Sequence, residues 1–232
     1  MKIAGLRKTS LIDFPERISS VVFTAGCNFY CSYCHNSQLL SLEDLAEAQM
    51  LSEEQFYNFL ADRKKLIDGV TITGGEPTLQ TDLKDFIEKI RSDYGLQIKL
   101  DTNGSRPFVL KELLEQNLID YLAMDIKMSW AKYSLLAPAD LITGVKESLK
   151  IVLASELDYE LRTTVVPGLH DKAEIEKIAA AAGGAERYFI QNFRPLNTLD
   201  PNLKEERQFS PSELKSFKKA AEKYIENVHI RD

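Results

Sequence analysis

Short β-branched or aliphatic runs alternate with helical patterns along the whole chain, and this alternation restricts the fold more than any other feature. The helical segments carry clear start signals, such as the capping-box pattern Ser52-Glu-Glu-Gln55 and the Ser210-Pro-Ser-Glu213 start of the last helix. Parallel strands joined by right-handed crossovers are the usual outcome of such alternation. Strands are predicted at residues 18–23, 69–73, 96–100, 119–124, 159–165 and 188–190.

Six strand–helix units suit either a doubly wound open sheet or a barrel with fewer than the usual eight units. One strand separates these alternatives. In segment 159–165, Glu160, Arg162 and Thr164 share one face, whereas strands of a parallel sheet normally carry apolar residues on both faces. A polar face indicates a strand that lines a wet cavity. We therefore expect an α/β fold, a partial (β/α)6 barrel with parallel strands that is open on one side.

Composition limits the choice of partners. Lys and Arg total 29 against 35 Asp and Glu, a net charge of −6, which lacks the basic footprint of a nucleic-acid binder. No apolar run approaches the roughly 20 residues needed to span a membrane, and residues 1–16 do not resemble a signal peptide. We expect a single cytoplasmic domain, residues 1–232, with neither nucleic acid nor membrane as a partner, since no repeat or linker divides the chain.

Three cysteines, Cys27, Cys31 and Cys34, have the spacing C-x3-C-x2-C, and the chain contains no fourth. Iron–sulfur clusters are usually held by four thiolates, so three would leave one iron of a cubic cluster open to a small molecule. The pattern also matches the C-x-x-C-H signature of haem attachment, and His35 could complete a Cys3His zinc site. An odd number of cysteines and a chain expected to be cytosolic both argue against a disulfide.

Polar or glycine-rich groups follow the carboxyl end of five predicted strands and lie late in the other, 159–165; the carboxyl ends of the strands form the functional face of α/β folds. Taken separately, each group also has a structural explanation: a tight turn, a loop start, a helix cap or a solvated charge. The groups, in chain order, are the three cysteines; Gly74-Gly75-Glu76-Pro77; Asp101-Thr102-Asn103-Gly104; Asp125 with Lys127; Arg162 with Thr164; and Gln191, Asn192 and Arg194.

These motifs together resemble a known family. The three cysteines, with Tyr33 just before the last and Gly-Gly-Glu-Pro after the next strand, resemble the signature of radical S-adenosylmethionine enzymes. The stretches Asp101-Thr-Asn-Gly, Met124-Asp-Ile-Lys127 and Val165-Val-Pro-Gly168 are similar to those of glycyl-radical-enzyme activases. Residues 5–15 and Cys34-His-Asn36 resemble activating proteins of anaerobic ribonucleoside-triphosphate reductase.

The resemblance implies a [4Fe–4S] cluster on the three cysteines, with S-adenosyl-L-methionine chelated to the fourth iron. One electron, from a low-potential donor such as flavodoxin or ferredoxin, would cleave the sulfonium and leave a 5′-deoxyadenosyl radical. That radical would abstract a hydrogen atom from a glycyl radical enzyme, which is the expected protein partner. The cofactor performs the difficult step, and the protein orients it.

The resemblance also assigns roles by motif position. Gly74, Gly75 and Glu76 would hold the methionine amino group, Tyr33 would lie near the adenine, and Lys127 and Arg162 near the carboxylate and ribose. Asn103, in the Asp101-Thr-Asn-Gly stretch, is a further cofactor-binding candidate. Asp101, Thr102 and Asp125 match a monovalent cation site beside the methionine carboxylate. Arg194 stands where an activase of pyruvate formate-lyase carries a His that faces the nucleoside.

Two other functions stay open. The same radical chemistry could act on a small molecule, such as a nucleoside or a cofactor precursor. A non-enzymatic, zinc-stapled binding module on an α/β scaffold would use the cysteines without any S-adenosylmethionine. The first predicts brown, oxygen-sensitive protein, and the second predicts colourless, air-stable protein.

Overall fold

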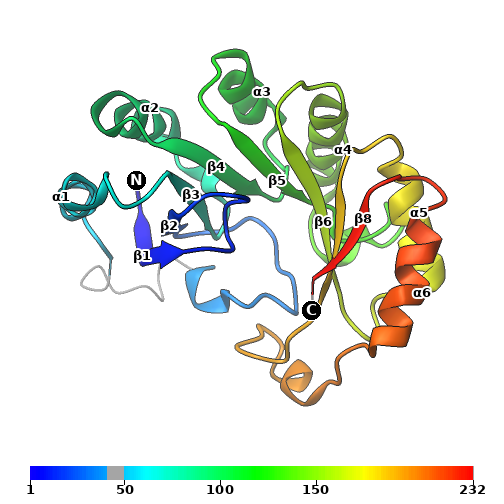
Figure 1. Cartoon of the computed structure of the whole chain (residues 1–232). Coiled ribbons are helices and arrows are strands. Elements are labelled where there is room, and N and C mark those ends of the chain that lie inside the picture. Colours follow the sequence, from blue (N-terminus) through cyan, green and yellow to red (C-terminus); the bar gives the residue numbers. More distant parts are fainter. Residues whose placement is uncertain (41–49, 232) are drawn as a thin grey trace. The chain divides into compact units, whose positions relative to one another are not determined.

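The strands of the sheet keep the order in which they occur along the chain. In a computed structural model that describes residues 1–40 and 50–231, eight strands are hydrogen-bonded in the order β1 to β8 (Figure 1). The chain divides into two units. Unit 1 comprises Met1–Asn28, Gln38–Thr102 and Arg106–Leu122, and unit 2 comprises Phe29–Ser37, Asn103–Ser105 and Ala123–Asp232.

Unit 1 contains the first half of the sheet. Its strands are β1 (Ile3–Ser10), β2 (Ser19–Thr24), β3 (Gly69–Gly74) and β4 (Gln97–Thr102). β1 runs antiparallel to β2, whereas β2, β3 and β4 are parallel. Val22, Ile72 and Leu100 lie side by side across β2, β3 and β4 and are completely buried. Burial of this apolar row stabilises this part of the sheet.

Each helix of unit 1 has one terminal residue that favours a helix start or end. α1 (Glu53–Arg63) begins with the capping box that the sequence predicts, in which Ser52 and Gln55 bond reciprocally. α2 (Leu83–Tyr94) buries four apolar residues at helical spacing and ends at Gly95, whose left-handed conformation suits glycine. α3 (Pro107–Glu115) has proline in its first turn. Two short 3-10 helices are η1 (Ser37–Leu39), which begins in unit 2, and η3 (Pro77–Leu79).

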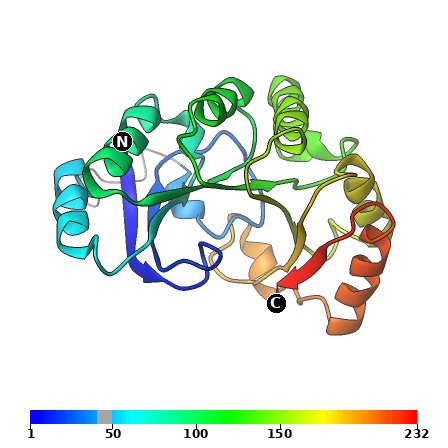
Figure 2. The ribbon, with the colours of Figure 1, turned by 45° about the horizontal axis from the view of Figure 1, so that its top comes forward.

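β5 (Tyr121–Asp125) begins in unit 1 and ends in unit 2. Unit 2 continues with the parallel strands β6 (Tyr159–Val165), β7 (Tyr188–Asn192) and β8 (Val228–Arg231). Its helices are α4 (Ala139–Leu153), α5 (Lys172–Ala181) and α6 (Pro211–Ala221), with 3-10 helices η4 (Tyr133–Leu135) and η5 (Pro201–Glu205). α5 packs on α6, and α6 contacts β7 and β8, as both views of the ribbon show (Figures 1 and 2).

The structure contains the six predicted strands, with ends that shift by no more than two residues. Two further strands, β1 and β8, were not predicted. β1 contains Gly5, and Arg7, Lys8 and Thr9 in its second half are exposed, so it has no apolar pattern to signal it. β8 is only four residues long. Across the described residues, no helix is both long and apolar enough to cross a membrane.

Candidate functional site

The cysteine motif crosses the boundary between the units along the chain. Cys27, three residues after β2, belongs to unit 1, and Cys31 and Cys34 belong to unit 2. In unit 2 the amide of Cys34 donates to the carbonyl of Cys31 at 3.0 Å, which closes a turn between the two thiols. Burial raises the pKa of the Cys31 thiol, and the Lys127 charge partly offsets that rise. Burial likewise raises the pKa of Cys34, so metal binding would have to displace thiol protons.

In unit 1 the Gly74-Gly75-Glu76 segment packs directly on the backbone that leads into Cys27. The amide of Gly75 donates to the carbonyl of Thr24 at 2.9 Å, and the amide of Glu76 donates to the carbonyl of Gly26 at 2.8 Å. A Cβ on Gly75 would lie 2.0 Å from the carbonyl oxygen of Gly26, and one on Gly74, whose φ is +119°, would lie 2.2 Å from the Thr24 nitrogen. Glycine is required at both positions because backbone occupies the space of a side chain.

Glu76 itself is only 1% exposed. Its Oε1 accepts hydrogen bonds from the Thr78 amide at 3.1 Å, the Thr78 hydroxyl at 2.5 Å and the Thr102 hydroxyl at 2.7 Å. Two predicted site residues, Glu76 and Thr102, therefore meet in unit 1. A buried carboxylate needs such donors, since burying a charge without them is costly. Thr78 was not among the predicted residues, and nothing in its type or spacing singles it out.

Asp101 and Thr102 were predicted to follow the strand and are instead the last two residues of β4, and Asp101 has a partner that was not predicted. The ammonium of Lys99, a residue only 2% exposed, is ion-paired with Asp101 two residues along the same strand. Alternate residues of a strand point to the same face, so this pairing follows from the i, i+2 spacing. A lysine between the apolar residues Ile98 and Leu100 of β4 is the sequence signal that could have identified it.

In unit 2, Asp125, Lys127 and Arg162 form one charged cluster. Arg162 Nε lies 2.8 Å from Asp125 Oδ1, and Lys127 Nζ lies 3.1 Å from Asp125 Oδ2. Burial opposes the ionisation of Asp125, but the Arg162 and Lys127 charges overcome it and hold the pKa of Asp125 well below its usual range. Burial would also lower the pKa of Lys127, yet Asp125 and the neighbouring groups raise it instead. Both residues stay charged at neutral pH.

The cluster extends to β8 through residues that the sequence did not identify. Arg162 lies 3.9 Å from Glu160, which is 1% exposed, and Arg231 forms two hydrogen bonds of 2.7 Å with that carboxylate. The Arg231 guanidinium also lies over the Phe189 ring, 3.6 Å from its centroid. Glu160 was placed on the polar face of its strand by sequence, but the partner on the unpredicted strand β8 could not be found that way.

The remaining predicted residues have separate surroundings in unit 2. Tyr33 is buried, and burial together with the Cys31 charge raises the pKa of its hydroxyl well above the usual value. Asn103 uses Oδ1 to accept from the Ser105 amide at 2.9 Å. The carbonyl of Arg194 is 2.8 Å from Nε2 of His35, and this bond links the cysteine segment to the chain after β7. The predicted roles of these three residues stay predictions.

The donor chemistry fits the implied cluster. Three thiols in eight residues suit iron–sulfur or zinc ligation, and the adjacent glycine segment packs closely on the backbone that leads into Cys27 because it has no side chains. Within residues 1–40 and 50–231, no three His, Cys, Asp or Glu side chains are grouped as metal ligands. The assignment of Cys27, Cys31 and Cys34 to one cluster therefore rests on spacing and chemistry, and it stays a prediction.

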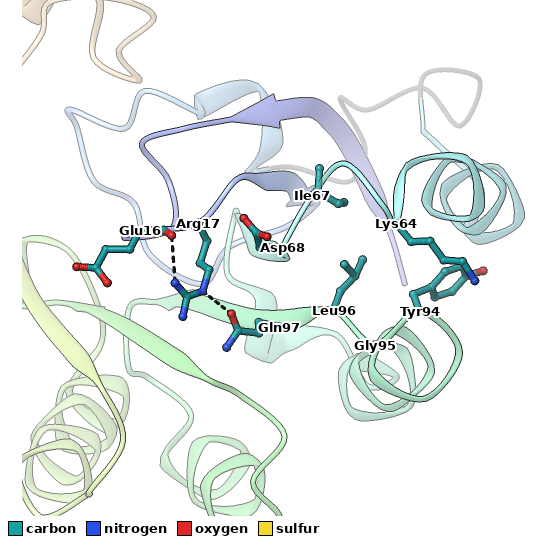
Figure 3. Close-up of a pocket in the computed structure, with 9 residues that line it drawn as sticks. All are labelled: Glu16, Arg17, Lys64, Ile67, Asp68, Tyr94, Gly95, Leu96 and Gln97. Atoms are coloured by element: carbon teal, nitrogen blue, oxygen red, sulfur yellow. Dashed lines mark hydrogen bonds between the residues drawn. The ribbon is translucent and has the colours of Figure 1, made fainter.

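A separate pocket lies at the opposite end of the strands in unit 1. Its lining precedes β2, β3 and β4, and Figure 3 shows Arg17 reaching across it to Gln97, with Nε 2.6 Å from Oε1. The pocket has a volume of about 400 Å³ and is open and mostly polar. Asp68 at its centre accepts from the amide of Ile18 at 2.8 Å. These contacts join the strand ends and have no reactive group among them.

Known proteins support the sequence interpretation. Residues 21–182 match the Radical SAM superfamily. A Methanocaldococcus jannaschii protein assigned as a glycyl-radical enzyme activating enzyme is 34% identical over 237 aligned residues, covering 99% of this chain and 95% of that protein. The pyruvate formate-lyase-activating enzyme of Clostridium pasteurianum is 29% identical, with 87% of this chain and 84% of that enzyme covered.

A solved structure agrees with the fold. A domain of pyruvate-formate lyase-activating enzyme from Bacteroides vulgatus superposes with a TM-score of 0.55 at 18% identity, covering 71% of this chain and 99% of that domain. The expected α/β fold with parallel strands, a partial barrel, is confirmed. With the family match over most of its length, the chain belongs to the radical S-adenosylmethionine superfamily of enzymes.

Proposed function

We propose that this protein cleaves S-adenosylmethionine reductively and installs a glycyl radical on a partner enzyme, anaerobic ribonucleoside-triphosphate reductase. The observation that carries the proposal is the buried Glu76 carboxylate, held behind two glycines that pack on the chain leading into Cys27. A carboxylate held in place beside a glycine backbone would suit an ammonium group, such as the amino group of a methionine moiety. The named relatives support the same activity.

Cys27, Cys31 and Cys34 would hold a [4Fe–4S] cluster, which when bound supplies the electron that splits the sulfonium into methionine and a 5′-deoxyadenosyl radical. Glu76 and the backbone of Gly74 and Gly75 would orient the methionine amino group. Orientation is the main contribution that the protein makes in such cofactor chemistry.

In unit 2, the charged cluster of Asp125, Lys127 and Arg162 would provide the positive charge for S-adenosylmethionine binding. Asp125 holds the two cations in place, because it bonds to both at 2.8 and 3.1 Å. Lys127 and Arg162 would then direct positive charge at the carboxylate and ribose of S-adenosylmethionine. Tyr33 would cover the adenine, with Asn103 and Arg194 as further contacts to the adenosyl group. A flavodoxin or a ferredoxin would act as the electron donor.

The test uses anaerobically reconstituted protein with reductant, S-adenosylmethionine and the reductase from the same organism. Electron paramagnetic resonance should show a glycyl doublet on the reductase, and the doublet should be absent with Cys34→Ala. The partner variant that lacks the radical-bearing glycine is the matched control. Cleavage of S-adenosylmethionine without a doublet on any glycyl radical enzyme would point instead to a small-molecule substrate. Colourless protein containing zinc would favour the binding module and contradict the proposal.

A further inference from the structure

Lys99 places a buried ammonium in the strand that carries two of the candidate site residues. It lies in the middle of β4, is only 2% exposed, and is aligned with Thr71 of β3. Burying an unpaired ammonium costs roughly several kcal/mol per ion. A lysine at such a position therefore needs a carboxylate partner. Lysine is therefore not an ordinary core residue here, and its role depends on what it contacts.

The partner is Asp101, one of the residues expected to bind a monovalent cation. Lys99 Nζ is ion-paired with Asp101 Oδ1, and the Asp101 side chain is 14% exposed. The ammonium also lies 5.9 Å from the centroid of the Tyr121 ring, which gives it a second favourable contact. The negative charge of Asp101 is thus neutralised from within unit 1.

The other expected carboxylate ligand is in the same situation within unit 2. Asp125 bonds to the Arg162 guanidinium at 2.8 Å and to the Lys127 ammonium at 3.1 Å. Sodium or potassium would be attracted by the negative charge of the Asp101 and Asp125 oxygens. Lysine and arginine side chains already compensate that charge. Hard cations bind best where oxygen ligands retain their negative charge, and neither carboxylate offers that. The residues therefore do not fit the expected cation.

We propose that the Lys99 ammonium takes the place of the monovalent cation in this chain, so that neither folding nor S-adenosylmethionine binding requires sodium or potassium. An ammonium has the same charge as these ions and donates hydrogen bonds to a carboxylate. Unlike an exchangeable ion, it is covalently fixed to the strand. The part of this inference that concerns S-adenosylmethionine binding rests on the proposed function. The neutralisation of Asp101 by Lys99 does not.

The first experiment measures thermal unfolding of the cluster-free chain in potassium, sodium and choline chloride at equal ionic strength. The wild type should unfold at the same temperature in all three salts, because equal ionic strength screens equally. Lys99→Ala leaves Asp101 without its ammonium and opens space beside it. This variant should gain a stabilising shift specific to potassium, ammonium or methylammonium. Lys89→Ala, which removes an exposed lysine paired with Asp93 on α2, is the matched control and should show no such specificity.

The second experiment measures S-adenosylmethionine binding to the reconstituted protein by equilibrium dialysis in the same salts. Wild-type affinity should be the same within about twofold in all of these salts. They have equal ionic strength and differ only in their cation, and the inference requires no particular cation. Lys99→Ala should bind roughly 10–100-fold more weakly in choline, the range seen when the partner of a ligand-positioning group is removed. Methylammonium should restore part of that affinity, and Lys99→Arg should retain most of it.

A potassium requirement in the wild type, in either experiment, would overturn the inference even if Lys99→Ala does not fold. A folded Lys99→Ala without any cation-specific response would overturn it as well. Failure of the reconstituted wild type to bind S-adenosylmethionine would contradict the proposed function instead. In that case the unfolding measurements still decide the role of Lys99.

Discussion

The two units hold a carboxylate of the candidate site, fully buried in Glu76 and partly buried in Asp125, in different ways. In unit 1, Glu76 accepts three hydrogen bonds from neutral groups, namely two threonine hydroxyls and an amide. In unit 2, Asp125 is bonded to two cations, Arg162 and Lys127. The hydrogen bonds of Glu76 within unit 1 thus come from neutral donors, whereas the charge of Asp125 is compensated by two cationic partners.

This difference separates two roles. A carboxylate held by neutral donors can receive a cationic ligand, so under the proposed function Glu76 would bind the methionine amino group. A carboxylate with two cationic partners is better suited to hold those partners in position, so Asp125 would act through Arg162 and Lys127. Breaking a compensated pair should mainly affect folding, and changing the charge of Glu76 should mainly affect ligand binding.

The largest effect is expected for Arg162→Met. This change removes a guanidinium that is 13% exposed and leaves Asp125 and Glu160 without that partner. Loss of one member of a buried pair costs about 3–5 kcal/mol of unfolding free energy. Urea denaturation of the cluster-free chain measures it. Arg187→Met is the control, since its partner Asp158 is 72% exposed and such pairs contribute about 0–1 kcal/mol. Equal losses in the two variants would contradict the distinction between them.

Glu76→Gln should separate binding from folding. The amide keeps an oxygen that can accept from Thr78 and Thr102, so we expect stability to change by less than about 1 kcal/mol. S-adenosylmethionine affinity should fall roughly 10–100-fold, because a charge-assisted bond contributes about 1.5–3 kcal/mol. Binding to the reconstituted protein is the measurement, with the visible absorption of the cluster as proof of loading. Glu88→Gln, on the exposed side of α2, should leave the affinity unchanged. A normal affinity in Glu76→Gln would remove Glu76 from the site.

The backbone packing of unit 1 provides a third test. Gly75→Ala places a methyl group where the Gly26 carbonyl lies, at 2.0 Å, so the segment has to move. We expect a loss of about 1–3 kcal/mol, the usual cost of overpacking, together with weaker S-adenosylmethionine binding. Gly5→Ala is the matched control in the same unit, because its Cβ would meet Phe23 at an ordinary 3.6 Å. A Gly75→Ala variant as stable as the control would show that the segment adapts without strain.

The sequence predicts the fold well where apolar periodicity is strong. β6 and the capping box of α1 occur where the pattern placed them, because burial and capping are local consequences of residue type. β1 could not be predicted, since an exposed edge strand is stabilised by its hydrogen bonds to β2 rather than by an apolar face. β8 is too short for any periodicity to show.

The candidate site was predictable to the extent that motifs fix it. Gly74 and Gly75 were identified as site residues because they belong to a recognisable motif. The structure explains why both are glycine, since neighbouring backbone lies where a side chain would be. The pairing of Asp101 with Lys99 was missed, although the spacing of two places them on one face, because the resemblance assigned Asp101 to a cation instead. The bond between Glu160 and Arg231 joins residues 71 positions apart, and no local pattern reports such a contact.

The smallest expected effect is a change in the acid dependence of stability. The pKa of Asp125 is lowered in the folded chain. As the pH falls, Asp125 therefore becomes protonated in the unfolded chain before it does in the folded chain. The stabilisation from Asp125 is complete above the usual pKa of an aspartate and is lost on acidification toward the lowered value. Wild type and Asp125→Asn should therefore differ most at neutral pH and converge between about pH 5 and about pH 2. Urea denaturation across this range tests it, and because the group is partly buried, the convergence should persist at high salt. Parallel stability curves would mean that Asp125 is not held in its charged form by Arg162 and Lys127, and the contrast with Glu76 would fail.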